Sequence, residues 1–446
     1  LAPLPSMAQE EGAAAAEPPP VSFRRDVAPA LLDRCLGCHG GGRKRGSYSV
    51  ETYSALLEPG RSDEPPIVPG KPDESYLYRL LVHDDPDERM PQDGDKLPET
   101  VLATVRRWIE EGAKYDGTDP TASLATIIVR SRHPLPPEPY GAPVPITALV
   151  FSPDGKELAA SGYHEVTVWN PDTGQIVRRL PNLEQRILAL EWSRSGEFLA
   201  VAGGTPGRHG EVAILDPRTG RAHLRVASAS DIVSDVALDP STSRIAAAMP
   251  DGTVAVYEIP SGRELLRVRA HSDWVLGVSF SADGKRLATA SRDKTARVYD
   301  VESGDLLATY SGHSEAVVSV SFDPAEPSVW TASADRRIHR FKIDDGNRNG
   351  EIGGFGGEIC ALRVEGDLIY SACADGTTRI HKRGDRAQLH RLEGHGDWVY
   401  SVAADPIAGR VASGSFTGEI RVWKIEDGAL VVSFTAVPPP RELREL

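Results

Sequence analysis

A repeat of about 42 residues most strongly constrains what this chain can fold into. In each unit a hydrophobic or aromatic position closes a short predicted strand, and the residues at that position are Trp169, Leu215, Tyr257, Tyr299, Phe341, His381 and Trp423. Successive members are 46, 42, 42, 42, 40 and 42 residues apart. This period, with four short alternating strands per unit, is typical of β-propeller blades. We therefore expect residues 146–446 to form an all-β propeller with seven blades.

The repeats resemble those of WD-repeat propellers. The residues that carry this resemblance are the dipeptides Gly312-His313 and Gly394-His395, the turn aspartates Asp251, Asp293, Asp335 and Asp375, and the strand-closing Trp169 and Trp423. The resemblance implies that such His, Ser, Asp and Trp residues form a buried hydrogen-bond network inside a blade, which is a structural role. Thr417 stands where the last blade would carry Asp. We therefore expect that blade to fold with less internal hydrogen bonding.

Two segments are candidates for the strand that closes the ring. Leu430 to Phe434 can supply the outer strand of the last blade, and Leu124 to Arg130 could close the ring from the N-terminal side. We favour the C-terminal segment. Cys360 and Cys373 lie on the two strands of a predicted hairpin in the sixth blade. A disulfide requires that the register place them opposite each other, and a pair of buried free thiols is the alternative.

The N-terminal part of the chain has a different pattern. Residues 21–117 are predicted to form a small all-α domain, whose first helix has one apolar stripe made of Phe23, Val27, Leu31 and Cys35. Ser22 is its expected N-cap. A second helix is predicted from Pro98 to Glu111, with Gly112 ending it, and a short helical piece is expected around residues 75–82.

Two further segments are predicted to contain little regular structure. Residues 1–20 are rich in Ala, Pro and Glu, so we expect a disordered leader. Ser6-Met7-Ala8 has the small-x-Ala form of a signal-peptide cleavage site, although a charged n-region and an apolar h-region are absent. The leader is therefore interpreted as the remnant of a signal peptide, with an ordinary flexible terminus as the alternative. Residues 118–145 are proline-dense and are predicted to be a linker.

The motif that carries chemistry is Cys35-Leu36-Gly37-Cys38-His39. A C-x-x-C-H sequence is typical of covalent attachment of a c-type haem. On one helical turn the two thiols can reach the two vinyl groups of the porphyrin, while the histidine presents a ring nitrogen to iron. A redox disulfide or half a zinc site are alternatives for a Cys-x-x-Cys pair. The adjacent His39, and the absence of a second cysteine pair nearby, count against both.

Met90 is the candidate for the second axial ligand of that iron. It lies 51 residues beyond His39, in a predicted loop before the C-terminal helix of the domain. Ligation by Met and His favours the ferrous state and suits electron transfer. A gap-filling core residue is the alternative role for Met90. His83 is the rival ligand, but it precedes a strongly acidic segment and is expected to be exposed.

The first domain also resembles the planctomycete-type cytochrome c domain. The matching stretches are 23–39, 68–75, 89–91 and 107–113, which together cover most of residues 21–117. The resemblance implies a monohaem c-type fold that holds one covalent haem c. Cys35 and Cys38 would be its attachment sites, His39 the proximal ligand and Met90 the distal ligand. Covalent haem attachment takes place outside the cytoplasm, so we expect a periplasmic or otherwise exported protein.

Composition and charge restrict the partners. The net charge of −14 argues against nucleic acid, because phosphates select basic surfaces. No apolar run approaches the roughly 18 residues needed to span a bilayer. The propeller contains no G-x-S-x-G, P-loop or H-E-x-x-H sequence, so no catalytic residues are assigned. The sequence does not indicate the oligomeric state or the identity of a redox partner.

We therefore interpret the chain as a periplasmic electron-transfer protein. The cytochrome domain would carry one electron, and the propeller would be the docking platform for a redox partner protein. Two alternatives remain open. One is a redox enzyme in which the haem relays electrons to a site on the propeller, and the other is a haem-containing scaffold or sensor.

Overall fold

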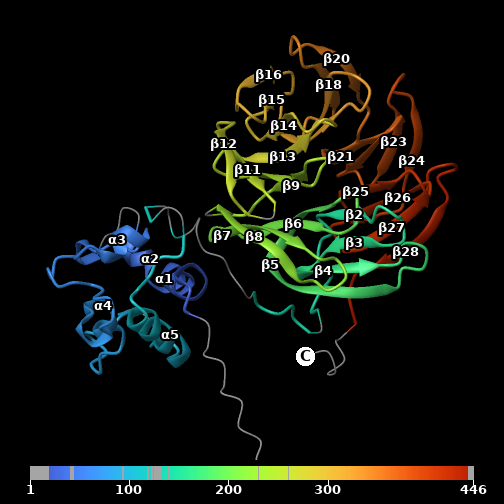
Figure 1. Ribbon diagram of the computed structural model, residues 1–446. Coiled ribbons are helices and arrows are strands. Elements are labelled where there is room, and N and C mark those ends of the chain that lie inside the picture. Colours follow the sequence, from blue (N-terminus) through green and yellow to red (C-terminus); the bar gives the residue numbers. More distant parts are fainter. Residues whose placement is uncertain are drawn as a thin grey trace, which may run out of the picture. The chain divides into compact units, whose positions relative to one another are not determined.

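The structure is a computed structural model that describes residues 20–40, 45–92, 95–117, 120–121, 124, 133–138, 140–229, 231–259 and 261–439. It divides into two compact units, Leu1–Leu124 and Ala125–Leu446 (Figure 1). The predicted leader lies outside the described residues except for Pro20, as does Ser6-Met7-Ala8, and much of the predicted linker 118–145 lies outside them too. Among the described residues, no helix has the length and apolar character that crossing a bilayer requires.

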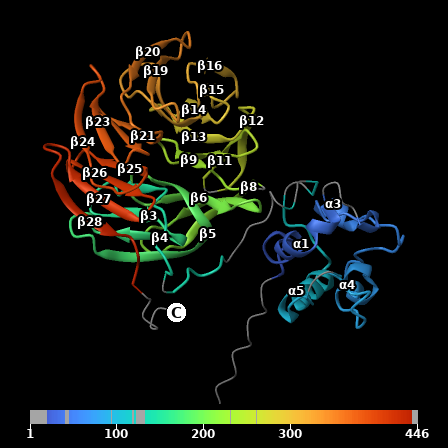
Figure 2. The same ribbon diagram turned by 180° about the vertical axis from the view of Figure 1, so that it is seen from behind.

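The first unit is built from short helices and loops (Figure 2). Its described helices are η1 (Phe23–Val27), α1 (Ala28–Arg34), α2 (Leu36–His39), η2 (Arg45–Ser47), α3 (Tyr53–Leu57), η3 (Pro72–Glu74), α4 (Tyr76–Leu81) and α5 (Glu99–Glu110). The predicted first helix is present, and the Ser22 side chain accepts a hydrogen bond from the Arg25 N–H as its cap. Its first turn, η1, is a π-helix, which the four-residue spacing did not predict.

The core of this unit forms where the two longer helical segments meet. Phe23 is fully buried, and its ring centroid lies 5.2 Å from that of Trp108 on α5 and 5.0 Å from that of Tyr53. Helix α5 begins after Pro98 and ends near Gly112, which has a φ of +98° that favours glycine. The prediction of this helix from its apolar spacing is confirmed.

The second unit consists of strands. Within the described residues they are β2 (Leu149–Phe151), β3 (Leu158–Ser161), β4 (Tyr163–Trp169), β5 (Ile176–Trp192), β6 (Leu199–Thr205), β7 (His209–Leu215), β8 (Ala222–Ala229), β9 (Asp235–Leu238), β10 (Arg244–Ala248), β11 (Thr253–Glu258), β12 (Glu264–Arg269), β13 (Val275–Phe280), β14 (Arg286–Ser291), β15 (Ala296–Asp300), β16 (Leu306–Tyr310), β17 (Val317–Phe322), β18 (Ser328–Ser333), β19 (Ile338–Lys342), β20 (Arg348–Ile352), β21 (Ile359–Glu365), β22 (Leu368–Cys373), β23 (Thr378–Lys382), β24 (Gln388–Leu392), β25 (Val399–Asp405), β26 (Arg410–Ser415), β27 (Glu419–Lys424) and β28 (Leu430–Thr435).

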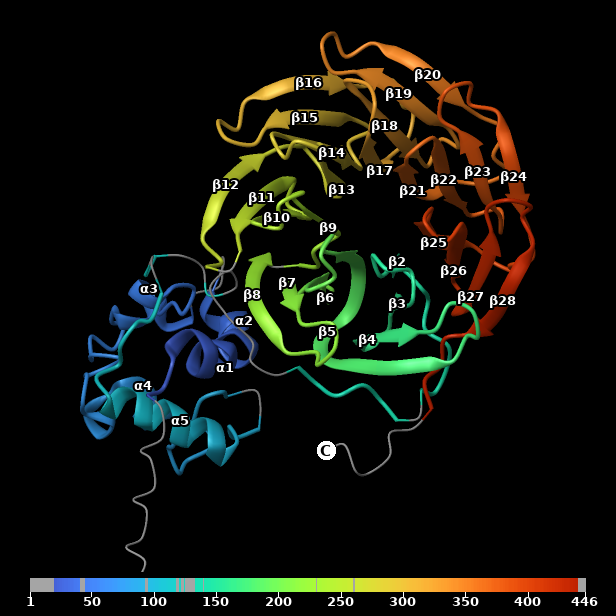
Figure 3. The same ribbon diagram turned by 45° about the vertical axis from the view of Figure 1, so that its right-hand side comes forward.

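These strands are arranged in a ring of antiparallel sheets (Figure 3). In the described part of the chain, five sheets have four strands each, and one sheet has seven strands in the order β2 to β8. The larger sheet arises because β5 is 17 residues long. Its first part pairs with β4 and its second part, from Arg186, pairs with β6. One strand therefore joins two repeat units, and the count of seven separate blades stays a prediction.

The ring closes by contact between its first and last sheets, since β2 packs against β25. The last sheet takes all four of its strands, β25 to β28, from consecutive sequence. The prediction that Leu430 to Phe434 forms the outer strand is confirmed, because β28 pairs along β27. The rival segment after Leu124 lies outside the described residues.

Hydrophobic cores lie between neighbouring sheets. Phe341 is fully buried in one of these cores, together with Val298 and Tyr310 of the preceding sheet. The repeat position seen in the sequence has a backbone counterpart. At Trp169, Leu215, Tyr257, Tyr299, Phe341, His381 and Trp423 the pairing with the next strand shifts register. The repeat therefore marks the same irregularity in every unit.

Buried hydrogen-bond networks link the strands within several of the repeats. His313 lies 2.8 Å from Asp335 through Nδ1 and 2.9 Å from Thr331 Oγ1 through Nε2. The last repeat, β25 to β28, lacks that aspartate, as the sequence indicated. Its buried histidine still has a carboxylate and a hydroxyl as partners. His395 Nδ1 lies 3.0 Å from Glu419 Oε2, and its Nε2 lies 2.7 Å from Ser413 Oγ. The expectation of less hydrogen bonding in this unit was therefore wrong, because Glu419 reaches the position that the aspartate would fill.

The two cysteines of the second unit are free thiols. Cys373 is paired with Ile359 in the sheet, and Cys360 occupies the position where the register shifts. Cys360 is thus the extra residue of a bulge beside Cys373, and no disulfide joins the two. Burial raises the pKa of Cys360 to about 12 and that of Cys373 to about 11. The interpretation as free thiols agrees with the structure.

Candidate functional site

The Cys-x-x-Cys-His segment forms a single helical turn. Cys35 ends α1 and precedes α2, and the N–H groups of Cys38 and His39 donate to the Cys35 carbonyl at 3.1 and 3.0 Å. The Cys35 N–H in turn donates to Leu31. Both cysteines are free and half-buried. The backbone thus places the two thiols and the imidazole on one turn, as the sequence predicted.

Beside this turn lies a cavity of about 380 Å³. Cys35, His39 and Met90 all line it, whereas Cys38 and His83 are not among its lining residues. Its walls are mostly apolar and include Tyr48, Val50, Pro66, Leu77, Leu80 and Leu81. The structure therefore brings together three of the four predicted site residues, although Met90 is far from the others in sequence.

His39 is held firmly at the cavity wall. Its carbonyl accepts a hydrogen bond from the Val50 N–H at 2.9 Å, and its ring lies edge-on to Tyr48 with centroids 5.6 Å apart. Tyr48 is fixed by its own hydroxyl, which donates to the Leu56 carbonyl at 2.8 Å. The buried Nδ1 of His39 has no hydrogen-bond partner among the described residues. A half-buried imidazole of this kind fits a residue that binds a metal.

Met90 and His83 are in different environments. The Met90 N–H donates to the Leu80 carbonyl at 3.0 Å, and both residues line the cavity. His83 contacts the acidic segment instead, with Nε2 3.4 Å from Glu88 and Nδ1 accepting from the Asp85 N–H. Of the two rivals, only Met90 is positioned on the wall that carries His39.

The polar groups of the cavity are mainly cationic. Arg45 and Arg61 line it together with Glu64. Burial, followed by the proximity of Cys38, raises the pKa of the Cys35 thiol to about 11. This thiol is therefore neutral at pH 7 in the described state.

Comparison with known protein families identifies both parts of the chain. Planctomycete cytochrome C matches residues 35–94, and the WD domain, G-beta repeat, matches residues 262–300, 304–341 and 386–424. The chain is a fusion of a planctomycete-type cytochrome c domain with WD repeats. The cytochrome c match includes the cysteine turn and Met90, so all four predicted site residues lie inside it.

Curated relatives match only a short stretch of the chain. Eukaryotic translation initiation factor 3 subunit I of Vanderwaltozyma polyspora is 32% identical over 75 residues, which are 17% of this chain and 22% of that protein. The same subunit of Debaryomyces hansenii is 37% identical over 79 residues, which are 18% of this chain and 23% of that protein. The chain thus spans less than a quarter of the length of these relatives.

A solved structure supports the fold of the second unit. The crystal structure of the computationally designed Ika8 protein matches with a TM-score of 0.53 and 24% identity, over 68% of this chain and 90% of that one. At this identity the likeness concerns the fold alone.

The residues of the cytochrome c domain fit a haem. The cavity is apolar, as a porphyrin requires, and its wall carries a thiol, an imidazole and a thioether. The guanidinium groups of Arg45 and Arg61 match the charge of haem propionates. Sequence reasoning did not single out Arg61, since an isolated arginine in a loop has no distinguishing pattern.

A second cavity, of about 310 Å³, lies among the inner strands of the ring. Its lining includes Glu191, Asp235 and Arg363. Burial raises the pKa of Glu191 to about 7 and that of Asp235 to about 6, although Arg363 and backbone N–H groups oppose the shift. Glu191 accepts from the Leu238 N–H, and Asp235 accepts from the Val278 N–H, each at 2.9 Å. These carboxyls therefore also join neighbouring sheets.

Proposed function

We propose that this protein is an exported, periplasmic electron carrier with one covalent haem c and a docking platform for a redox partner. The observation that carries the proposal is that Cys35, His39 and Met90 line one apolar cavity within the cytochrome c domain. An iron held by both the Met90 thioether and the His39 imidazole would have no open position. This favours electron transfer over catalysis on a bound small molecule.

The four predicted site residues have distinct roles in this proposal. Cys35 and Cys38 would hold the haem through their thiols, and His39 and Met90 would hold its iron through a ring nitrogen and a thioether sulfur. When bound, the haem supplies reversible one-electron exchange between the ferric and ferrous states. The apolar wall limits the access of water, which tunes the potential together with the axial ligands. Arg61 offsets negative charge at the edge of the cavity.

The WD repeats form the other half of the proposal. WD propellers imply protein interactions, and this ring exposes aromatic side chains that suit them. Trp398 is 44% exposed and Phe416 is 49% exposed, and both pack edge-on against Tyr400. In the proposed architecture there are seven blades, and β5 serves as the outer strand of the first blade and the inner strand of the second.

The axial ligand is tested by Met90→Ala in the haem-loaded protein. We expect the variant to lose the weak sulfur-to-iron band of the ferric spectrum and to have a lower reduction potential, because the thioether favours ferrous iron. The matched control is Met249→Leu, a methionine fully buried in the second unit, which should leave band and potential unchanged. Ready binding of CO by the reduced wild-type protein would show an open position and refute the assignment.

Attachment and location need separate measurements. The double variant Cys35→Ser/Cys38→Ser should release its haem on denaturation and extraction, whereas the Cys360→Ser/Cys373→Ser control should retain it. Retention of haem by the first variant contradicts covalent attachment at these thiols. Fractionation of the native cell should place the haem-stained protein in the periplasm, and recovery in the cytoplasm contradicts the proposed location.

A further inference from the structure

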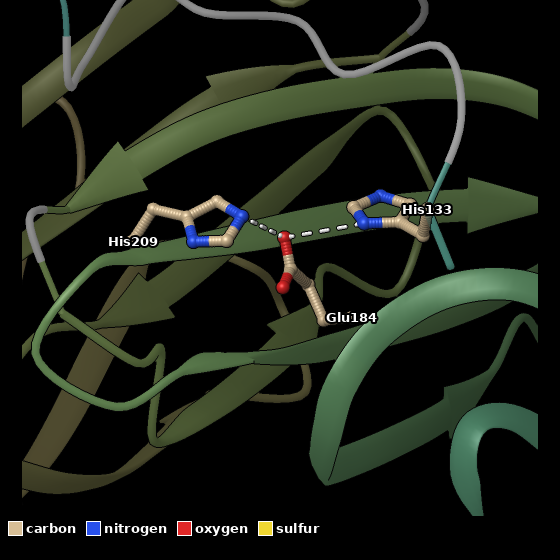
Figure 4. A group of neighbouring side chains, drawn as sticks. All are labelled: His133, Glu184 and His209. Carbon is tan, nitrogen blue, oxygen red and sulfur yellow. Dashed lines mark ion pairs between the residues drawn. The ribbon is translucent and has the colours of Figure 1, made fainter. Parts of the chain in front are cut away.

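Three buried side chains meet on the seven-stranded sheet of the second unit. Glu184 lies on β5 and His209 begins β7, while His133 precedes β2, the first strand among the described residues. Figure 4 shows the two imidazole rings on either side of the Glu184 carboxylate. The side chains of His133, Glu184 and His209 are only 2%, 3% and 10% exposed. Two imidazoles and a carboxylate thus converge where solvent is excluded.

The distances suit ligands of a common ion. Glu184 Oε1 lies 2.8 Å from His209 Nε2 and 3.6 Å from His133 Nδ1. The three candidate ligand atoms all lie within 4.8 Å of one another. Around a tetrahedral zinc with bonds near 2.0–2.1 Å, neighbouring ligand atoms are roughly 3.3 Å apart. The observed separations bracket that value, so a small adjustment of rotamers would complete the geometry.

His209 is the observation that distinguishes a ligand site from an ordinary polar cluster. Both of its ring nitrogens are buried, and neither makes a hydrogen bond within the described residues. A buried polar group without a hydrogen bond costs about 1–3 kcal/mol, so such groups are rare. Nε2 is near the Glu184 oxygen but not in hydrogen-bonding geometry. A cation between the two atoms would give Nε2 of His209 the partner that it lacks within the described residues.

His133 has the outer support that metal-binding histidines usually have. Its Nε2 lies 3.2 Å from Glu211 Oε1 and 2.9 Å from Arg225 Nη1, and Arg225 forms an ion pair with the same carboxylate. Its backbone N–H donates to the Asn182 side chain at 2.6 Å. Arg225 can only donate, so a metal bound through Nδ1 requires Arg225 to turn from Nε2 to the Glu211 carboxylate, which then accepts the Nε2 proton. A carboxylate that fixes the tautomer of a ligating histidine in this way is typical of metal sites.

We propose that His133, Glu184 and His209 bind one divalent transition-metal ion of the zinc class. Two imidazoles and one carboxylate form a borderline donor set that suits zinc and its neighbours rather than calcium or magnesium. The ion would join the segment at His133 to β5 and β7. Glu211 acts as a positioning residue for His133. The sequence offered no indication of this site, because its ligands are 51 and 25 residues apart and form no motif.

The test uses zinc and the full haem-loaded chain, after stripping with a chelator. Calorimetric titration should give one zinc per chain, and X-ray absorption at the zinc edge should show two imidazoles and oxygen without sulfur. His209→Ala and Glu184→Gln should abolish this binding. Glu211→Gln should weaken it by about 10–100-fold, the usual effect of losing such outer support. The matched control is His223→Ala, an exposed histidine on the same sheet, which should bind zinc as the wild type does.

Three results would overturn the proposal. They are a correctly folded wild-type chain that takes up no zinc, undiminished binding in His209→Ala, and sulfur in the zinc absorption spectrum. The first would mean that the three side chains form a buried polar cluster without an ion. If His209→Ala fails to fold, as judged by circular dichroism, zinc binding is measured in His209→Gln instead. The zinc-edge spectrum of the wild type then shows whether two imidazoles bind the ion. None of these readouts depends on the haem, so the result is independent of the proposed electron transfer.

Discussion

Removing one carboxylate from the His313 network should measurably destabilise the ring. Asp335 Oδ2 accepts from the His313 ring at 2.8 Å and from the Ser314 N–H at 3.1 Å, and Oδ1 accepts from the Arg337 N–H. The His313 side chain is fully buried and that of Asp335 is 5% exposed. Burial opposes ionisation of Asp335, but the hydrogen bond and charge interaction with His313 outweigh it and lower the pKa of Asp335.

The expected magnitude follows from these contacts. In Asp335→Ala the buried His313 N–H loses a charged acceptor, which costs about 1.5–3 kcal/mol. Water can replace the acceptor for the backbone N–H groups of Ser314 and Arg337, since both residues lie near the surface, so these add about 1 kcal/mol at most. The total is about 3 kcal/mol. For a large domain this corresponds to a decrease in Tm of about 5–10 °C.

Scanning calorimetry at pH 7 measures the change in Tm. Far-UV circular dichroism assigns the transition to the second unit, because the strands lie in that unit. The control is Asp305→Ala, an exposed turn residue whose side chain should contribute little. A double-mutant cycle of His313→Ala and Asp335→Ala isolates the interaction between the two side chains. The coupling energy from this cycle should exceed about 1 kcal/mol. An Asp335→Ala variant no less stable than the Asp305→Ala control would refute the reasoning.

Two further predictions concern the ring. Glu419→Ala should lower the unfolding free energy by about 2 kcal/mol, because the buried His395 loses its carboxylate partner. Thr417→Ala should lower it by less than about 1 kcal/mol. Calorimetry that gives the opposite order would contradict the role assigned to Glu419. Burial raises the pKa of Glu191 from 4.5 to about 7, so its contribution to stability is present below pH 4.5 and is lost as the pH rises through 7. Glu191→Gln should therefore match the wild type near pH 4.5 and exceed its unfolding free energy by about 3 kcal/mol at pH 8. Urea titrations at both pH values test this against the exposed control Glu197→Gln, and an equal difference at both would contradict it.

Local patterns predicted much of the fold. The repeat position at Trp169 and its counterparts marks a register shift that recurs with the strands, and its period could be read directly from the sequence. The turn from Cys35 to His39 follows from helical spacing, because residues four apart lie one above the other. The apolar face of α5 and the glycine that ends it are equally local.

Other features depended on contacts that no local pattern encodes. The replacement of the missing aspartate by Glu419 required the strand to bring a longer side chain to His395. Strand β5 joins the first two repeats because it continues beyond Pro181, where it pairs first with β4 and then, from Arg186, with β6. Cys360 occupies a register shift beside Cys373, and the two remain free thiols although both lie on one hairpin. In each case a shift of one residue in a strand changes which side chain meets which.

The sequence by itself determined the repeat, the two kinds of domain, and the residue types that suit a haem. It did so because hydrophobic period and motif spacing are properties of short segments. Only the tertiary structure decided that Met90 rather than His83 shares a cavity with His39, and that His133, Glu184 and His209 meet. Those arrangements depend on how distant segments pack, and buried side chains find their partners across strands and loops whose separation in sequence carries no period.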